Sequence, residues 1–227
     1  MVAFPRVDLL APPLAAYLES LAAVPVGSAQ EEEVRLEMEA VAARRGFPIV
    51  GAQVGRLLEV LARALRARRV LEMGSGFGYS AWWLARAVGA EGEVVLTEGS
   101  PERAREARDH LERAGLGRRA RIVVGDALAA VARESAPFDL VFNDVDKPAY
   151  PEAFAAARPL VRGGGLFVSD NMLWKGEVLA PAEDEADAAT AGVLELTRRL
   201  SADPDFLTVL IPLRDGVTVS LRHHPPG

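Results

Sequence analysis

A short strand, a glycine loop and the start of a helix follow one another in Arg69-Val70-Leu71-Glu72-Met73-Gly74-Ser75-Gly76-Phe77-Gly78-Tyr79-Ser80. An apolar run that ends in glycine predicts a buried strand, and the glycines let the backbone pass close to a ligand. The helix that follows presents its N–H groups to the same ligand. A dinucleotide-binding loop would have its third glycine at position 79, where this chain has Tyr79. The loop therefore indicates a ligand without a pyrophosphate.

Strands and helices alternate along the rest of the chain. Further strands are predicted at 93–97, 121–124, 138–142 and 166–169, with helices at 79–88, from 100 to about 115 and near 151–158. This rhythm predicts an α/β fold in which helices cover both faces of a mainly parallel sheet. A helix near 184–201 precedes strands at 206–212 and 217–222, and the intervening Arg214-Asp215-Gly216 indicates a hairpin. The last strand should therefore be antiparallel to its partner.

The amino-terminal residues differ from this pattern. Helical spacing of apolar residues predicts helices over 9–24 and 28–45, with Ser28 as the cap of the second. Residues 1–45 are expected to form a helical arm, and another helix should run from about Gln53 to about Arg66. No repeat or linker divides the chain, so 1–227 is predicted to be a single domain.

Composition excludes several classes of function. The chain has no cysteine, which removes disulfides and thiolate chemistry, and its three histidines make a His/Cys zinc site unexpected. The net charge of −6 argues against a large nucleic-acid interface. The first eight residues do not resemble a signal peptide, and no apolar stretch is long enough to span a bilayer. We expect a cytoplasmic protein that does not bind membranes.

Two polar clusters directly follow predicted strands. Asp144 lies just beyond the strand at 138–142, and Asp170 and Asn171 lie just beyond the strand at 166–169. The carboxyl ends of parallel strands form the ligand-binding edge of an open α/β sheet, so these side chains should meet there. Oxygen donors suit a hard divalent cation such as Mg²⁺. A lone aspartate at a strand end is more often a turn former, and the combination favours the metal site.

Glu98 ends the strand that follows the glycine loop and could bind a ribose diol. Together, the loop and this acid favour a nucleoside cofactor. The remaining conspicuous residues could each have a structural role instead. Trp174 could be a substrate-facing wall or ordinary loop packing, and Asp146 could cap the next helix. His110 is expected to face solvent.

At this point the sequence resembles the S-adenosylmethionine (SAM)-dependent class I methyltransferases, and more narrowly the cation-dependent catechol and caffeoyl-CoA O-methyltransferases. The resemblance covers roughly residues 46–222 and rests on four segments in the family's order. These are Val70-Leu71-Glu72-Met73-Gly74 with Gly78-Tyr79-Ser80, then Phe142-Asn143-Asp144-Val145-Asp146-Lys147-Pro148-Ala149-Tyr150, Ser169-Asp170-Asn171-Met172-Leu173-Trp174 and Ile211-Pro212-Leu213-Arg214-Asp215-Gly216. The chain departs from the family pattern at Asn143 and at Arg214, and Arg214 is close to the expected substrate entrance.

The resemblance implies a role for each matching residue. Asp144, Asp170 and Asn171 would bind the metal, with Mg²⁺ expected and Mn²⁺ or Ca²⁺ as alternatives. Lys147 would accept the proton of the substrate hydroxyl, and Asp144 would take part in catalysis. The SAM-binding residues would be Val50 and Gly51 over the methionine end, Ser80 and the Gly74 backbone at its carboxylate and amine, Glu98 at the ribose, Asp126 and Ala127 at the adenine, and Asp146 near the amine, with Glu72 and Asp144 as further cofactor-binding residues.

The chemistry explains why these residue types are needed. A phenol with a pKa of about 10 is mostly protonated at neutral pH, and a cation that holds two adjacent hydroxyls favours its ionised form. A lysine can accept a proton only when its charged form is disfavoured, and a sulfonium and a metal ion nearby would do this. An arginine could not serve in its place, because it does not lose its proton.

The sequence thus predicts a metal-dependent O-methyltransferase acting on a catechol-like, hydroxylated aromatic small molecule. Relatives of this kind pair, so a homodimer is expected. An alternative within the resemblance is methylation of a hydroxylated uridine in tRNA, which local arginine clusters could support. Two further functions compete with methyl transfer. A noncatalytic nucleotide sensor is disfavoured by the intact Lys147, and an NAD dehydrogenase is disfavoured by Tyr79.

Overall fold

The computed structural model describes residues 11–25, 27–179 and 187–223. Three predictions concern residues outside these ranges: the helix starts at 9–10 and at 184–186, and the lack of a signal peptide in the first eight residues. A seven-stranded sheet in the order β3-β2-β1-β4-β5-β7-β6 forms the centre of the fold. Its strands are β1 (Arg69–Met73), β2 (Glu93–Glu98), β3 (Ala120–Val124), β4 (Phe138–Asn143), β5 (Val161–Ser169), β6 (Phe206–Ile211) and β7 (Val217–Arg222).

The predicted sheet polarity is confirmed. Strands β1 to β5 pair in parallel, and β7 is antiparallel to both β5 and β6. Strand β5 starts at Val161, five residues earlier than predicted. The three glycines Gly163-Gly164-Gly165 weaken the strand signal in the sequence, whereas pairing with β4 holds the start of the strand in the sheet. The chain crosses from β3 back to β4, so β1 and β4 are neighbours at the point where the strand order reverses.

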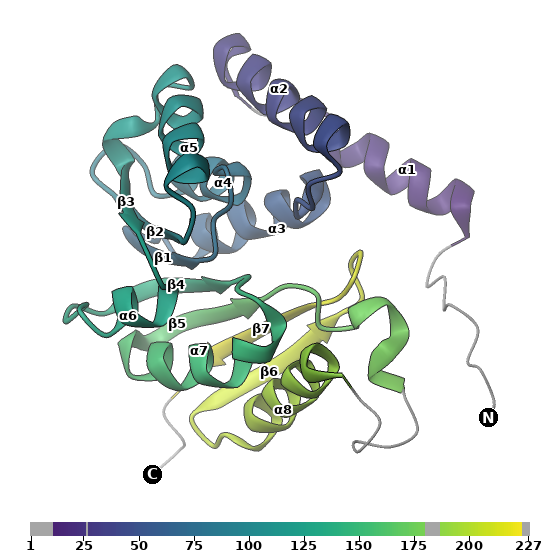
Figure 1. Cartoon of the computed structure of the whole chain (residues 1–227), viewed down its shortest axis with the longest axis vertical. Helices are drawn as coiled ribbons and strands as arrows, with labels where there is room; N and C mark the ends of the chain where they lie inside the picture. Colours follow the sequence, from purple (N-terminus) through teal and green to yellow (C-terminus); the bar gives the residue numbers. More distant parts are fainter. Residues whose placement is uncertain (1–10, 26, 180–186, 224–227) are drawn as a thin grey trace.

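Helices cover both faces of the sheet (Figure 1). The first face packs under α3 (Gly51–Ala64), α4 (Tyr79–Ala87) and α5 (Pro101–Arg113), and the second under α6 (Ala127–Val131), α7 (Tyr150–Ala157) and α8 (Ala188–Ala202). Alternate residues of β4 point to opposite faces of the sheet. Leu140 and Phe142 pack into the hydrophobic core on the first face, and Val141 packs into the core on the second. Short 3₁₀ helices lie at Gly117–Arg119, Lys147–Ala149 (η2), Arg158–Leu160 and Trp174–Leu179.

The predicted amino-terminal arm consists of α1 (Pro12–Ala22) and α2 (Ala29–Arg45), and α1 extends away from the sheet (Figure 1). Ser28 caps α2 as expected: its hydroxyl accepts a hydrogen bond from the Glu31 N–H, and the Glu31 carboxylate accepts one from the Ser28 N–H. None of the helices in the described residues is long and apolar enough to cross a membrane.

The expectation that His110 faces solvent is wrong. Its side chain is buried, and Nδ1 lies 3.0 Å from the carbonyl oxygen of Phe77, whose ring it meets edge-on at 5.8 Å. The apolar face of α5 includes Ala104, Ala107 and Leu111, and position 110 falls on that face at helical spacing. His110 therefore fixes the glycine loop against α5, and it is not a solvent-facing residue.

Candidate active site

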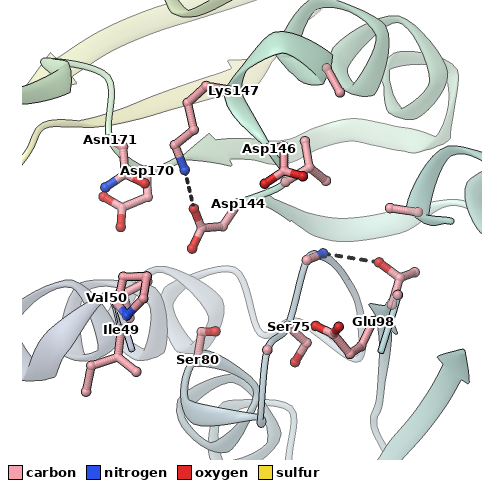
Figure 2. A pocket seen from close by; sticks show the side chains of 18 of the residues that line it. Ile49, Val50, Ser75, Ser80, Glu98, Asp144, Asp146, Lys147, Asp170 and Asn171 are labelled. Atoms are coloured by element: carbon pink, nitrogen blue, oxygen red, sulfur yellow. Dashed lines mark hydrogen bonds and ion pairs between the residues drawn. The ribbon is translucent and has the colours of Figure 1, made fainter. Parts of the chain in front are cut away.

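A large cavity, referred to as the main cavity, opens at the carboxyl edge of the sheet, where β1 and β4 lie side by side. This is the position at which open α/β sheets bind their ligands. The cavity has a volume of about 980 Å³ and lies between the glycine loop after β1 and the polar loops after β4 and β5. In Figure 2, Asp144, Lys147, Asp170 and Asn171 project into it from one side, opposite Ile49 and Val50.

Gly74 brings the two neighbouring strand ends together. It has a φ of +85°, and a Cβ at this position would lie 2.5 Å from the backbone oxygen of Asp144. The Asp144 N–H donates to the Met73 carbonyl at 2.9 Å, and the Gly74 N–H donates to the Thr97 hydroxyl at 3.1 Å. Only glycine fits this close approach, so the glycine loop and the first polar cluster form one unit.

Glu72 lies beneath the loop and does not line the cavity. Its side chain is fully buried, and one carboxylate oxygen accepts a hydrogen bond from the Ser75 hydroxyl at 2.7 Å. Burial raises the pKa of Glu72 to about 7, although hydrogen bonds from Ser80 and Ser75 act in the opposite direction. Both serines line the cavity. Glu72 is thus placed to hold the loop that would contact the cofactor.

The opposite end of the cavity is lined by Glu98 and by Arg103, which was not among the predicted site residues. One Glu98 oxygen accepts hydrogen bonds from the Ser100 N–H at 2.7 Å and from Arg103 Nε at 2.9 Å. The sequence signal that could have revealed Arg103 was its position in the first turn of α5, just after the end of β2. Asp126 lines the same region while its carboxylate caps α6 through the Ala129 N–H at 2.8 Å.

The predicted metal ligands lie together in the cavity. Asp170 is almost fully buried, and its Oδ1 atom has no hydrogen-bond partner among the described residues. Burial, and next the charge of Asp144, raise the pKa of Asp170 to about 7. Burial also raises the pKa of Asp144, against the opposing effect of Lys147. The charged forms of these two neighbouring carboxylates are thus disfavoured, and a positive charge beside them would favour ionisation.

Lys147 lies between the acidic cluster and two aromatic rings. Its Nζ is 3.0 Å from Asp144 Oδ1, and it lies 5.2 Å from the ring centre of Tyr150 and 5.7 Å from that of Trp174. Gly192 of α8 packs against the backbone of Lys147 so closely that a side chain there would overlap its carbonyl group. This contact fixes η2 and the base of the lysine, and no local sequence signal indicates it.

Two loops form the remaining wall of the cavity and are joined through their backbones. The N–H groups of Met172 and Leu173 donate to the carbonyls of Gly216 and Asp215 at 2.9 and 2.7 Å. The Lys175 N–H donates to Asp215 Oδ1 at 2.6 Å. Trp174, Lys175 and Asp215 line the cavity, so Trp174 is a cavity wall and not only loop packing.

Most predicted site residues therefore meet in one place. The residues that line the main cavity are Val50, Gly74, Ser80, Glu98, Asp126, Ala127, Asp144, Asp146, Lys147, Asp170 and Asn171. Gly51 does not: it lines a smaller cavity of about 390 Å³. Asp146 begins η2 without a side-chain capping bond, and its side chain points into the main cavity (Figure 2).

Comparison with known proteins identifies this arrangement. The O-methyltransferase family matches residues 27–223. The chain belongs to this family. It is 45% identical to a catechol O-methyltransferase from Mycobacterium tuberculosis over 143 residues, which are 63% of this chain and 64% of that protein. A catechol O-methyltransferase from Niastella koreensis is 35% identical over 179 residues, covering 76% of this chain and 80% of that relative.

A solved structure agrees with the sequence relatives. An O-methyltransferase from Streptomyces achromogenes in complex with SAM superposes with a TM-score of 0.82 and 32% identity, over 93% of this chain and 96% of that one. The expected family and enzyme class, a SAM-dependent O-methyltransferase, are thereby confirmed. This assignment argues against an NAD dehydrogenase and against a noncatalytic nucleotide sensor.

Proposed function

We propose that this protein transfers a methyl group from SAM to a hydroxyl of a catechol-like aromatic small molecule, with the help of a divalent cation. The observation that carries the proposal is the convergence of Asp144, Lys147, Asp170 and Asn171 at the cavity whose other end is lined by the glycine loop. Transfer forms a bond between the hydroxyl oxygen and the methyl carbon, breaks the sulfur–methyl bond and leaves S-adenosylhomocysteine.

The residues present fit a divalent cation. The described residues contain no group of three or more His, Cys, Asp or Glu side chains that could hold a metal, so Asp144 and Asp170 need the Asn171 amide as their third partner. The unpaired, buried Oδ1 of Asp170 supports this assignment. A bound Mg²⁺ would supply positive charge that favours ionisation of the acceptor hydroxyl. Mn²⁺ or Ca²⁺ would suit the same oxygen donors.

Lys147 is the residue that we assign as the proton acceptor. Asp144 holds its amine in place, and the rings of Tyr150 and Trp174 shield it from water. In this assignment Nζ takes the proton of the acceptor hydroxyl as the methyl group is transferred, while a cation held by Asp144 would favour ionisation of that hydroxyl. Trp174 provides an apolar face for the aromatic ring of the acceptor.

The cofactor side is assigned by position. We propose that Val50, Ser80 and the Gly74 backbone bind the methionine end of SAM, with Gly51 acting through the backbone turn beside Val50 and Glu72 through Ser75 and Ser80. Glu98 is assigned to the ribose hydroxyls, Asp126 and Ala127 to the adenine, and Asp146, with Asp144, to the amine. All but Gly51 and Glu72 line the main cavity.

The test is turnover of catechol with SAM, measured with and without Mg²⁺ and after addition of a chelator. The control substrate is a catechol in which both hydroxyls are already methylated, which offers no acceptor. Methylation that requires both Mg²⁺ and a hydroxyl is expected, with SAM binding measured separately by calorimetry. Methylation of tRNA that exceeds that of every catechol tested, with binding that weakens steeply in salt, would favour the RNA alternative instead.

We also propose that the protein is a homodimer. Leu14, Tyr17 and Leu21 on α1 are about half exposed. Apolar side chains at this spacing form one helix face, which pairing would cover. Light scattering should give twice the chain mass of 24.3 kDa, and a mass equal to one chain at micromolar concentration would contradict the proposal.

A further inference from the structure

Arg214 occupies an unusual position at the edge of the site. It follows β6 in the hairpin turn, and its φ of +51° is uncommon for a residue other than glycine, asparagine or aspartate. Its guanidinium lies directly against Gly51, where a Cβ would overlap Nη1 and lie 2.8 Å from Cζ. Gly51 follows Val50, which lines the main cavity. The turn conformation and the bare glycine therefore hold this cation beside the active site.

Arg214 also lines the smaller cavity, which adjoins the main one. Ile49 contributes to the walls of both, and Glu19 and Ser20 of α1 line the smaller one. The two cavities thus meet on the side of the main cavity that lies opposite Asp144 and Asn171 (Figure 2). The junction therefore lies across the main cavity from the proposed metal ligands.

The charges in the smaller cavity are not equivalent. Arg35 is buried and pairs with Glu32 at 2.8 Å and with Glu39 at 2.6 Å, and Glu39 also accepts a hydrogen bond from the Tyr79 hydroxyl at 2.6 Å. These groups are fixed by one another. Among the described residues, Arg214 instead forms one ion pair, from Nη1 to Glu19 Oε1 at 3.2 Å, and both side chains are substantially exposed.

An exposed ion pair of this kind stabilises a protein little, so a second carboxylate could replace Glu19 at small cost. We propose that Arg214 is a specificity residue that binds a carboxylate on the acceptor, and that Glu19 occupies its place in the absence of acceptor. The guanidinium presents paired donors that match a carboxylate, which favours a carboxylate over a neutral polar group. The preferred acceptors are then catechols with a carboxylated substituent. This inference rests on the proposed function and narrows its substrate class.

The experiment compares a catechol carboxylic acid with its methyl ester, using acids that carry the carboxylate on the ring or at the end of a short unsaturated chain. The readout is the ratio of kcat/KM for the acid to kcat/KM for the ester. Arg214→Ala should lower this ratio about tenfold, the loss expected when a hydrogen bond to a charged group is removed. Glu19→Gln should leave the ratio equal to the wild-type value or raise it, by up to about fivefold.

A matched control is available in Arg45→Ala. Arg45 is exposed and pairs with Glu106 at 2.8 Å, so its loss also breaks an ion pair between the arm and the body, but away from both cavities. The acid-to-ester ratio of this variant should equal that of the wild type. If Arg214→Ala has the wild-type ratio for every acid, or if Glu19→Gln lowers the ratio as Arg214→Ala does, Arg214 only pins α1 and the proposal is wrong.

The two proposals can fail separately. If the wild-type protein methylates neither the acid nor the ester, the proposed catechol function is contradicted. The ratio of the dissociation constants of acid and ester, measured by calorimetry with S-adenosylhomocysteine and Mg²⁺, then still tests Arg214. A ratio that Arg214→Ala shifts about tenfold supports the carboxylate site, and an unchanged ratio overturns it.

Discussion

Both halves of the cavity contain residues with positive φ, but the two halves differ in which residue types adopt it. On the cofactor side, residues with φ between +56° and +139° are the glycines Gly74, Gly76, Gly78 and Gly125. On the acceptor side, Gly176 and Gly216 also have positive φ, but so do Asn171, Trp174, Lys175 and Arg214, which adopt φ values between +45° and +58° although each carries a long or functional side chain. Glycine needs no compensation there, whereas each of the other residues costs of order 1 kcal/mol or more and is held by its surroundings.

The difference indicates what each half requires. The cofactor side must let a backbone approach a ligand and another strand, so a side chain would be an obstacle. The acceptor side needs side chains at fixed positions, and strained residues are tolerated there because the loops at 170–176 and 212–216 are bonded to each other. Substitutions should therefore fail in different ways on the two sides.

The largest effect on turnover is expected on the acceptor side, from Lys147→Ala. Loss of the proton acceptor should lower kcat about 10²- to 10⁴-fold, while SAM still binds through the other half of the cavity. Single-turnover kinetics and calorimetry measure the two quantities. Lys147→Arg is the control, because it can keep the ion pair with Asp144 but cannot give up its proton. Full turnover by either variant would contradict the assigned role.

A slightly smaller effect is expected from Asp170→Asn, which keeps the shape of the side chain but removes its charge. Affinity for Mg²⁺ should fall by about a hundredfold, because one of the two carboxylates proposed to bind the metal is lost. Calorimetric titration with Mg²⁺ measures this loss. Asp187→Asn changes an aspartate whose side chain caps α8 through the Thr190 N–H, and it should leave Mg²⁺ affinity unchanged. Equal affinity in the Asp170 variant and the wild type would remove Asp170 from the ligand set.

On the cofactor side, Gly74→Ala should impair folding and SAM binding together. The new Cβ would meet the Asp144 backbone, so we expect a loss of roughly 3 kcal/mol in the free energy of unfolding. Gly89→Ala is matched in φ, at +73°, but has open space around its Cβ, so it should lose only about 1 kcal/mol. Denaturant unfolding compares them, and equal losses would show that strain alone, without close approach, governs Gly74.

The last prediction concerns Glu72 and the pH dependence of stability. Its folded pKa of about 7 lies above the ordinary value of 4.5, so between these values the folded state holds a proton that the unfolded chain has lost. This contribution is fully present below pH 4.5 and disappears as the pH rises through 7, with a slope of at most about 1.4 kcal/mol per pH unit.

Glu72→Gln should flatten that fall in stability between pH 4.5 and 7, measured by denaturant unfolding without metal or SAM. Some slope should persist, because the pKa of Asp170 is also raised to about 7. A variant whose stability falls as steeply as that of the wild type would show that Glu72 titrates normally in the folded protein.

Much of the cavity could be predicted from local sequence. Local signals, each within a few neighbouring residues, indicate the glycine loop, the strand ends at Glu98 and Asp144, and the Asp-Gly hairpin. Arg103, Gly192 and His110 were missed or misplaced because their roles depend on what packs against them. The pairing of Arg103 with Glu98 and the contact of Gly192 with Lys147 join different elements of the fold.

The sequence by itself determined the parallel sheet, the position of the site at its carboxyl edge and the identity of the polar residues there. Periodicity and turn residues are local properties of the sequence, so they can be recognised without knowledge of the fold. Only the tertiary structure decided that Asp170 keeps an unpaired buried oxygen among the described residues, and that Arg214 meets Gly51 and Glu19, the latter 195 positions away. Contacts between distant segments depend on how helices and loops dock, and no local pattern encodes that docking.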